Sequence, residues 1–170
     1  MNRYVALLRA VNVGGHGKLA MSALTQICQS AGFGDVRTYI ASGNVVFDSD
    51  LGIAEITTAL QNGLRAHTGA EVPFFLRTGA QMQQVYDANP FAGQPPNRVA
   101  AIFLDGPPPA GAADTATGAR DEEIALGVSE IYVHYPSGMG TSRLKLRAGA
   151  TGTARNMNTV LKLVQMASTT

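Results

Sequence analysis

Polar and glycine residues that could bind a ligand form three short groups in this 170-residue chain. The first group runs from Arg9 to Lys18, the second is Ser42-Gly43-Asn44, and the third is Arg155-Asn156. Arginine and lysine supply positive charge, asparagine and serine supply neutral hydrogen bonds, and glycine lets backbone N–H groups approach a ligand closely. This combination indicates a site for a phosphate or a carboxylate. The predicted ligand-binding residues are Arg9, Asn12, Gly14, Gly15, His16, Lys18, Ser42, Asn44, Arg155 and Asn156.

The glycine-bearing part of the first group does not match a known nucleotide-binding motif. The run from Val13 to Lys18 has the wrong spacing both for a P-loop and for a dinucleotide fingerprint. A purely structural interpretation also exists, because glycines permit tight turns and asparagines often hydrogen-bond to their own loops. Asn156 or Thr153 would, on that interpretation, cap the last helix. The residue types alone leave both interpretations open.

Residues that could perform catalysis or bind a metal are few. The three histidines, His16, His67 and His134, do not share the spacing of metal ligands. Ser42 precedes a glycine but lacks the Gly-x-Ser-x-Gly pattern of a nucleophile elbow. His16 is the only side chain of the loop groups that titrates near neutral pH. We therefore predict no metal site and no cofactor, assign no catalytic residue, and leave open whether the protein is an enzyme.

The first 77 residues have a hydrophobic pattern that predicts a ferredoxin-like unit. Alternation and short apolar runs indicate strands, and apolar residues at helical spacing indicate helices. The order is strand, helix, strand, strand, helix, strand, which is the β-α-β-β-α-β arrangement. The predicted ranges are Tyr4–Arg9, Met21–Ala31, Val36–Ile40, Val45–Phe47, Ile53–Leu64 and Val72–Arg77.

This topology predicts that the first two groups of polar residues lie together. In such a unit the first and second strands are parallel, and the third lies antiparallel between them. The loop after the first strand and the hairpin joining strands two and three therefore share one end of the sheet. The first helix begins at the same end, and a helix N-terminus carries unpaired N–H groups and partial positive charge. We expect an anion site there.

The rest of the chain indicates a second unit of the same kind. A Thr78/Gln81 capping box begins a connecting helix, which ends in a proline-rich linker. Residues 97–101 then repeat the pattern of residues 2–6, which suggests that the same fold starts again. We predict an α+β protein of two related ferredoxin-like halves with antiparallel sheets, the second less regular. The predicted boundaries are 1–77, 78–97 for the connecting helix and linker, and 98–170.

Three elements are predicted within the second half. Residues 123–125 and 131–135 form a hairpin through Gly127, and a short helix runs near Thr141–Arg147. The segment Thr153–Thr159 opens the last helix. A cation at a helix start opposes the helix dipole, so Arg155 should be there for another reason, such as an anion. The predicted buried stripe of this helix is Met157, Val160, Leu161 and Val164.

Charge is distributed unevenly along the chain, although the net charge is only +1. Residues 105–130 contain six acids and one arginine, whereas residues 131–170 contain five cations and no acid. The basic end either binds an anion or is neutralised by the acidic middle. Nucleic acid is an alternative partner that we rank below a small anion, because the chain has no tryptophan and only 6% aromatic residues for base stacking.

Cys28, the single cysteine, cannot form an internal disulfide and fits an apolar helical pattern, so we predict a buried core residue. No apolar run is long enough to span a membrane, and no signal-peptide pattern is present. These features predict a cytoplasmic protein that does not bind membranes. The oligomeric state is left open.

Four motifs resemble those of a bacterial family catalogued as domain of unknown function 1697. They are Leu7–Gly15 with Lys18–Met21, then Tyr39–Phe47, Tyr132–Pro136, and Ala154–Asn156 continuing to Leu163. The chain differs from the family at Ala10, usually glycine, and at Met157, usually aromatic. The resemblance implies two related α/β halves, and it implies no particular activity.

Overall fold

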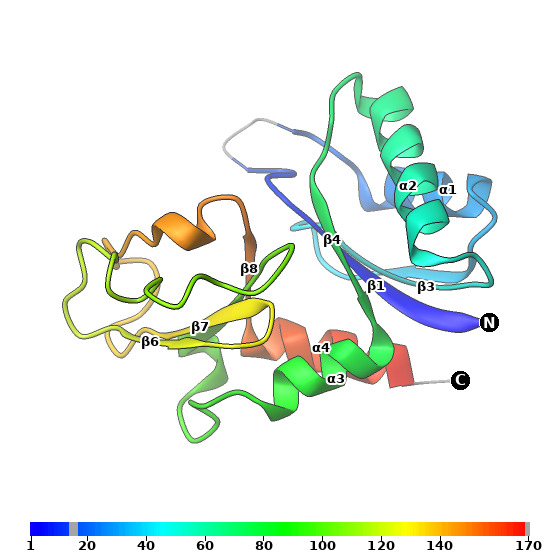
Figure 1. Cartoon of the computed structure of the whole chain (residues 1–170). Helices are drawn as coiled ribbons and strands as arrows, with labels where there is room; N and C mark the ends of the chain where they lie inside the picture. The colour runs from blue at the N-terminus through cyan, green and yellow to red at the C-terminus, as the bar shows by residue number, and fades with distance from the viewer. Residues whose placement is uncertain (14–16, 169–170) are drawn as a thin grey trace. The chain divides into compact units, whose positions relative to one another are not determined.

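The computed structural model describes residues 1–13 and 17–168, which form two α+β units (Figure 1). The first unit is Met1–Met82 together with the end of helix α4 (Met157–Ser168) from Leu163 onward, and the second is Gln83–Lys162. Each unit contains one four-stranded antiparallel sheet, which confirms the predicted fold class. No helix in the described ranges has the length and apolar character needed to cross a membrane.

The first unit has the predicted ferredoxin-like order. Its sheet is arranged β2-β3-β1-β4, and β1 pairs antiparallel with both β3 and β4. Strand β4 lies at the edge, as the proline at position 73 suggested. Strand β2 ends earlier than predicted, because Ile40 has a φ of +51° and so leaves the extended conformation. The elements are β1 (Asn2–Leu8), α1 (Met21–Ser30), β2 (Gly34–Thr38), β3 (Asn44–Ser49), α2 (Ile53–Thr68) and β4 (Phe74–Thr78).

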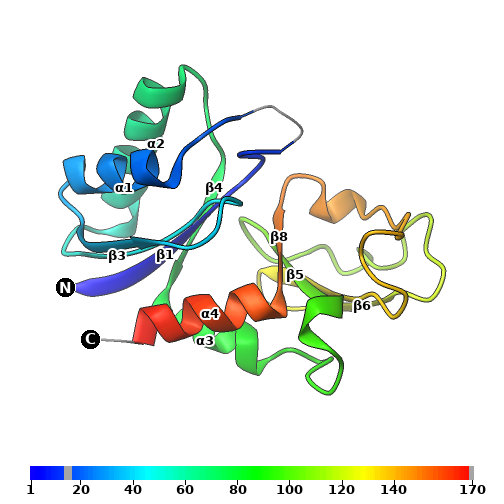
Figure 2. The same ribbon diagram turned by 180° about the vertical axis from the view of Figure 1, so that it is seen from behind.

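Helices α1 and α2 lie side by side on one face of the first sheet (Figures 1 and 2). Their apolar faces and alternate residues of β1 form one buried cluster, which includes Leu24 and Leu60. A Cβ added at Gly63 would lie 2.6 Å from Ile27 Cγ2, so the two helices pack closely there. Cys28 is fully buried in this cluster, as predicted, and burial raises the pKa of its thiol to about 12.

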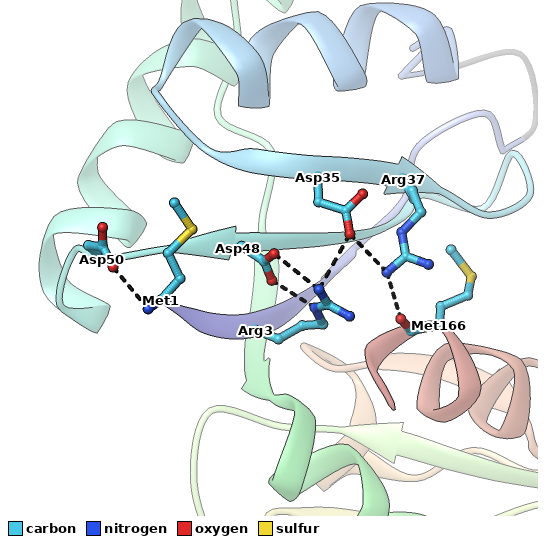
Figure 3. Close-up of polar contacts among 7 residues, drawn as sticks. All are labelled: Met1, Arg3, Asp35, Arg37, Asp48, Asp50 and Met166. Carbon is cyan, nitrogen blue, oxygen red and sulfur yellow. Dashed lines mark hydrogen bonds and ion pairs between the residues drawn. The ribbon is translucent and has the colours of Figure 1, made fainter. Parts of the chain in front are cut away.

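A network of ion pairs on the first unit joins three strands to the end of α4 (Figure 3). Arg3 Nε and Nη2 donate to the two carboxylate oxygens of Asp48 at 2.7 and 3.0 Å, and Nη2 also donates to Asp35 at 3.3 Å. Arg37 lies 3.5 Å from the same Asp35 oxygen and donates to the Met166 carbonyl oxygen at 2.7 Å. The network thus attaches the last turn of α4 to the sheet.

The second unit repeats the strand order of the first. Its sheet is arranged β6-β7-β5-β8, with every neighbouring pair antiparallel. The connecting helix α3 (Gly79–Asp87) begins with the predicted capping box, in which Thr78 and Gln81 exchange two hydrogen bonds. After it come η1 (Pro96–Arg98), β5 (Val99–Phe103), β6 (Glu123–Leu126), β7 (Glu130–His134), η2 (Arg147–Gly149) and β8 (Thr153–Asn156).

The second unit lacks the two helices that cover the first sheet. Residues 104–122 and 135–152, all of them described, form no α-helix, and they pack over a smaller apolar cluster. The predicted helix at Thr141–Arg147 is wrong. Lys145 pairs with Thr117 in an isolated β-bridge, and only a short 3₁₀ turn follows. The physical reason is the period of two in this segment, where Leu144 and Leu146 alternate with cations.

The start of the last helix also differs from the prediction. Residues Thr153–Asn156 form strand β8 against β5, and α4 begins only at Met157. Asn156 caps the helix as expected, because its Oδ1 accepts a hydrogen bond from the Thr159 N–H at 3.0 Å. In the predicted buried stripe, Leu161 is only half-buried, and Leu163 is buried instead.

Candidate functional site

The loop after β1 and the β2–β3 hairpin meet at one end of the first sheet, where topology placed them. The Leu8 N–H donates to the Gly43 carbonyl oxygen at 2.8 Å. Gly43 has a φ of +93°, and a Cβ there would lie 2.7 Å from Val11 Cγ2 and 2.9 Å from Leu8 Cβ. Only glycine fits this conformation and this close approach. The two loops are therefore held together by the backbone itself.

Asn12 joins the two loops through its side chain. Its Nδ2 donates to the carbonyl oxygens of Leu19 and Ala41, both at 2.8 Å, and its Oδ1 accepts from the Leu19 N–H at 2.9 Å. The residue has a φ of +55°, a conformation that asparagine tolerates better than most residues. Since both hydrogens of its amide are used within the protein, Asn12 shapes the loops.

The buried side chain of Asn44 stabilises the β2–β3 hairpin through hydrogen bonds. The side chain is fully buried and donates to the Tyr39 carbonyl oxygen at 2.9 Å and to Ser42 Oγ at 3.1 Å. These bonds connect the two ends of the turn. Asn44 and Ser42 therefore set the position of Ala41, which Asn12 contacts from the other loop.

A pocket of about 490 Å³ opens where the two loops meet the start of α1. Lys18 is exposed beside it, and no acid is among its lining residues in the described part of the chain. Helix α1 begins here without a side-chain cap on Ala20 and without an acid in its first turn. The ammonium group and the first N–H groups of the helix together favour an anion. The lining residues are Asn12, Lys18, Leu19, Ala20, Met21 and Ala41.

Among the described residues, Arg9, Ser42 and Asn44 were also predicted for this site and do not line the pocket. Arg9 is half-buried, and its backbone N–H donates to the Pro73 carbonyl oxygen at 2.8 Å. Ser42 and Asn44 support the hairpin. Gly14, Gly15 and His16 lie outside the described residues.

The family model described as protein of unknown function (DUF1697) matches residues 1–132. This chain belongs to the DUF1697 family. A solved structure of a conserved bacterial protein, SP0830 from Streptococcus pneumoniae, shares the fold, with a TM-score of 0.80 and 23% sequence identity. The similarity covers 98% of this chain and 99% of that one. No curated protein matches the chain significantly.

The loop after β1 has an unusual backbone conformation at Ala10. Ala10 has a φ of +59°, in the left-handed region that glycine adopts without strain. The N–H of Asn12 donates to the Gly17 carbonyl oxygen at 2.9 Å, and a Cβ at Gly17 would lie 2.5 Å from the Ala10 carbonyl oxygen. The backbone of Gly17 therefore lies close to that of Ala10 and Asn12.

Arg155 and Asn156 belong to the second unit and lie beyond the residues that the family model matches. Arg155 lies in strand β8, so the expectation that it stands at a helix start is wrong. Its buried guanidinium donates from Nη1 to Thr153 Oγ1 at 2.7 Å and to the Ala154 carbonyl oxygen at 3.0 Å. Burial lowers the pKa of Arg155 to about 10. Asn156 is the helix cap already described.

Sequence reasoning missed the apolar lining of the pocket. Apolar residue types do not by themselves indicate a binding site, and only the predicted start of α1 pointed to this position. The apolar lining residues are Leu19, Ala20, Met21 and Ala41. Within the described ranges, no three His, Cys, Asp or Glu side chains come close enough to hold a metal ion.

Proposed function

We propose that this protein binds a small phosphate- or carboxylate-bearing ligand in the pocket of its first unit. The observation that carries the proposal is the position of Lys18 beside the uncapped start of α1, in a pocket of about 490 Å³. Backbone N–H groups at a helix start and a nearby ammonium are a common combination for anions. The volume is within the range of roughly 300–1,000 Å³ that small-molecule sites occupy.

The predicted residues have two different roles in this proposal. Lys18 and the first N–H groups of α1 contact the anionic group, and Arg9 adds positive charge nearby. Asn12, Ser42 and Asn44 hold the two loops in position, which their hydrogen bonds within the protein support. The roles of Gly14, Gly15 and His16, and of Arg155 and Asn156, stay sequence-based predictions.

The apolar part of the pocket restricts the class of ligand further. Leu19, Ala20, Met21 and Ala41 line it beside Lys18. Bare inorganic phosphate would leave these surfaces in contact with water. A ligand with an apolar or aromatic portion next to its acidic group would bury them and gain affinity. The cytoplasmic location stays a prediction from the sequence.

Thermal-shift measurements with inorganic phosphate, nucleotides, sugar phosphates and aromatic or aliphatic carboxylates at millimolar concentration test this proposal. We expect a raised Tm with at least one organic anion. Lys18→Gln should weaken the affinity for that anion about tenfold, a loss of about 1.4 kcal/mol.

Lys162→Gln is the matched control, because Lys162 is also an exposed lysine and lies in the second unit. Its affinity should equal that of the wild type. The absence of any shift across the panel, or equal affinities in the Lys18→Gln and Lys162→Gln variants, would contradict the proposal.

A further inference from the structure

The second unit exposes three cations in a row. Arg143, Lys145 and Arg147 are all exposed, whereas the alternating Leu144 and Leu146 are half-buried against the apolar cluster of that unit. The segment pairs as a strand at Lys145, and in an extended segment alternate side chains point to the same side, about 6.8 Å apart. Arg147 follows at the start of the 3₁₀ turn η2. We call these three residues the basic ridge; it belongs to the segment coloured orange in Figure 1.

The backbone under the basic ridge is held firmly. Lys145 exchanges two backbone hydrogen bonds with Thr117, at 2.8 and 3.0 Å. Gly118 has a φ of +72°, and a Cβ there would lie 2.2 Å from the Arg143 carbonyl oxygen. Glycine is therefore required for this close approach. The ridge is a fixed feature of the unit, since its leucines and its backbone are both anchored.

The structure shows which partners the charged side chains of this segment have. The sequence left open whether the acidic middle neutralises the basic end. Within the described part of the chain, no ion pair or side-chain hydrogen bond involves any ridge cation. Glu122 accepts a hydrogen bond from Ser142 Oγ at 3.2 Å, so negative charge lies just before Arg143. From Arg143 to Arg147 no described acid forms an ion pair with the ridge.

We propose that the basic ridge binds the phosphodiester backbone of single-stranded nucleic acid. A short row of exposed cations matches a partner with regularly spaced negative charges, and an extended single strand has this form. The cations are long and exposed, so each can reach a phosphate without rearranging the fold. We expect little dependence on base sequence, because the ridge supplies charge and no aromatic platform.

An anionic membrane surface fits this ridge less well. Helices or segments that bind membranes place apolar side chains in the interface between lipid headgroups and acyl chains. The two leucines of the ridge pack against the core of their own unit and are unavailable for this purpose. The ridge therefore offers charge alone, which suits a flexible polyanion in water.

Fluorescence anisotropy of labelled dT20 and rU20 at 20–200 mM salt tests the proposal. With three phosphate contacts, log K should fall with log salt with a slope of about −2, since each contact to a single strand contributes roughly 0.7. Arg143→Gln/Lys145→Gln should reduce the slope to about −0.7 and weaken binding at least tenfold at low salt.

Arg65→Gln/Lys162→Gln is the control, because it removes the same charge from exposed positions elsewhere. Its slope should stay near that of the wild type. Three results would overturn the proposal: no binding of either oligonucleotide by the wild type, equal losses in the ridge and control variants, or binding of phosphatidylserine vesicles without binding of oligonucleotides.

Discussion

The side-chain amide of Asn12 donates a hydrogen bond to the carbonyl oxygen of Ala41 at 2.8 Å, although 29 residues separate them. The same amide group also bonds Leu19 in both directions. One side chain thus connects the loop after β1, the hairpin and the segment that enters α1. The geometry of the candidate site depends on this connection.

Asn12→Asp should destabilise the first unit by about 1–3 kcal/mol, because a carboxylate cannot donate to the Leu19 and Ala41 carbonyl oxygens. The free energy of unfolding from urea titration at pH 7 measures this loss. Asn62→Asp, at an exposed position of α2, is the control and should change it by less than about 0.5 kcal/mol. Equal stabilities of the two variants would show that the Asn12 bonds contribute nothing.

Gly43→Ala should destabilise the protein more than Gly69→Ala. Both glycines have positive φ, at +93° and +76°, so both substitutions introduce backbone strain. Only at Gly43 would the new Cβ also meet Val11 and Leu8, whereas nothing lies within 4 Å at Gly69. We expect an additional loss of about 1–3 kcal/mol at Gly43 from this overpacking. Thermal unfolding of both variants gives the difference, and a difference of zero would contradict the close packing of the loops.

The Arg3–Asp48 pair should make stability depend on pH in the acid range. The hydrogen bonds from Arg3 hold the pKa of Asp48 below its ordinary value. Because the folded-state pKa is lowered, the contribution is complete above the unfolded pKa of about 3.9 and is lost as pH falls through the folded pKa. Asp48→Asn should therefore be less stable than the wild type at pH 7. That gap should narrow progressively below about pH 4 in urea titrations, and a gap independent of pH would exclude this linkage.

Arg37→Ala should loosen the end of α4. The Arg37 guanidinium bonds the Met166 carbonyl oxygen, one of the last carbonyls of the helix, which have no partner within the helix. A cation at this position also favours the helix dipole. Hydrogen–deuterium exchange should become faster in residues 163–168 and stay unchanged in residues 157–160. Arg65→Ala, in α2, is the control, and the same exchange pattern in both variants would contradict a specific role for Arg37.

Much of the fold followed from local patterns. The period of the apolar residues predicted the order of elements in the first unit, and the Thr78/Gln81 capping box was correct in detail. The predictions failed where a short polar segment could be a helix or a strand. Lys145, in the first of these segments, pairs with the distant Thr117, and residues 153–156 pair with strand β5, so neither segment is part of a helix where one was predicted. Such pairing depends on partners far away in sequence, which local patterns do not reveal.

The candidate site divides in the same way. Residue types predicted the polar loops, and topology predicted that they converge. Only the hydrogen bonds in the structure show which of these residues hold the loops in position. Asn12 and Asn44 are polar enough to bind a ligand, yet their amides are used to hold the loops.

The sequence by itself determined the strand order, the buried cysteine and the family, because these depend on periodicity and on motifs that neighbouring residues carry. Tertiary structure alone decided which of the described cations form ion pairs and which polar groups line a pocket. Charge pairing and burial are properties of groups that meet across the fold. Asn12, Ser42 and Asn44 suggested an anion site from their residue types, but their hydrogen bonds hold the loops in position. The proposed binding surface is Lys18 together with the start of α1.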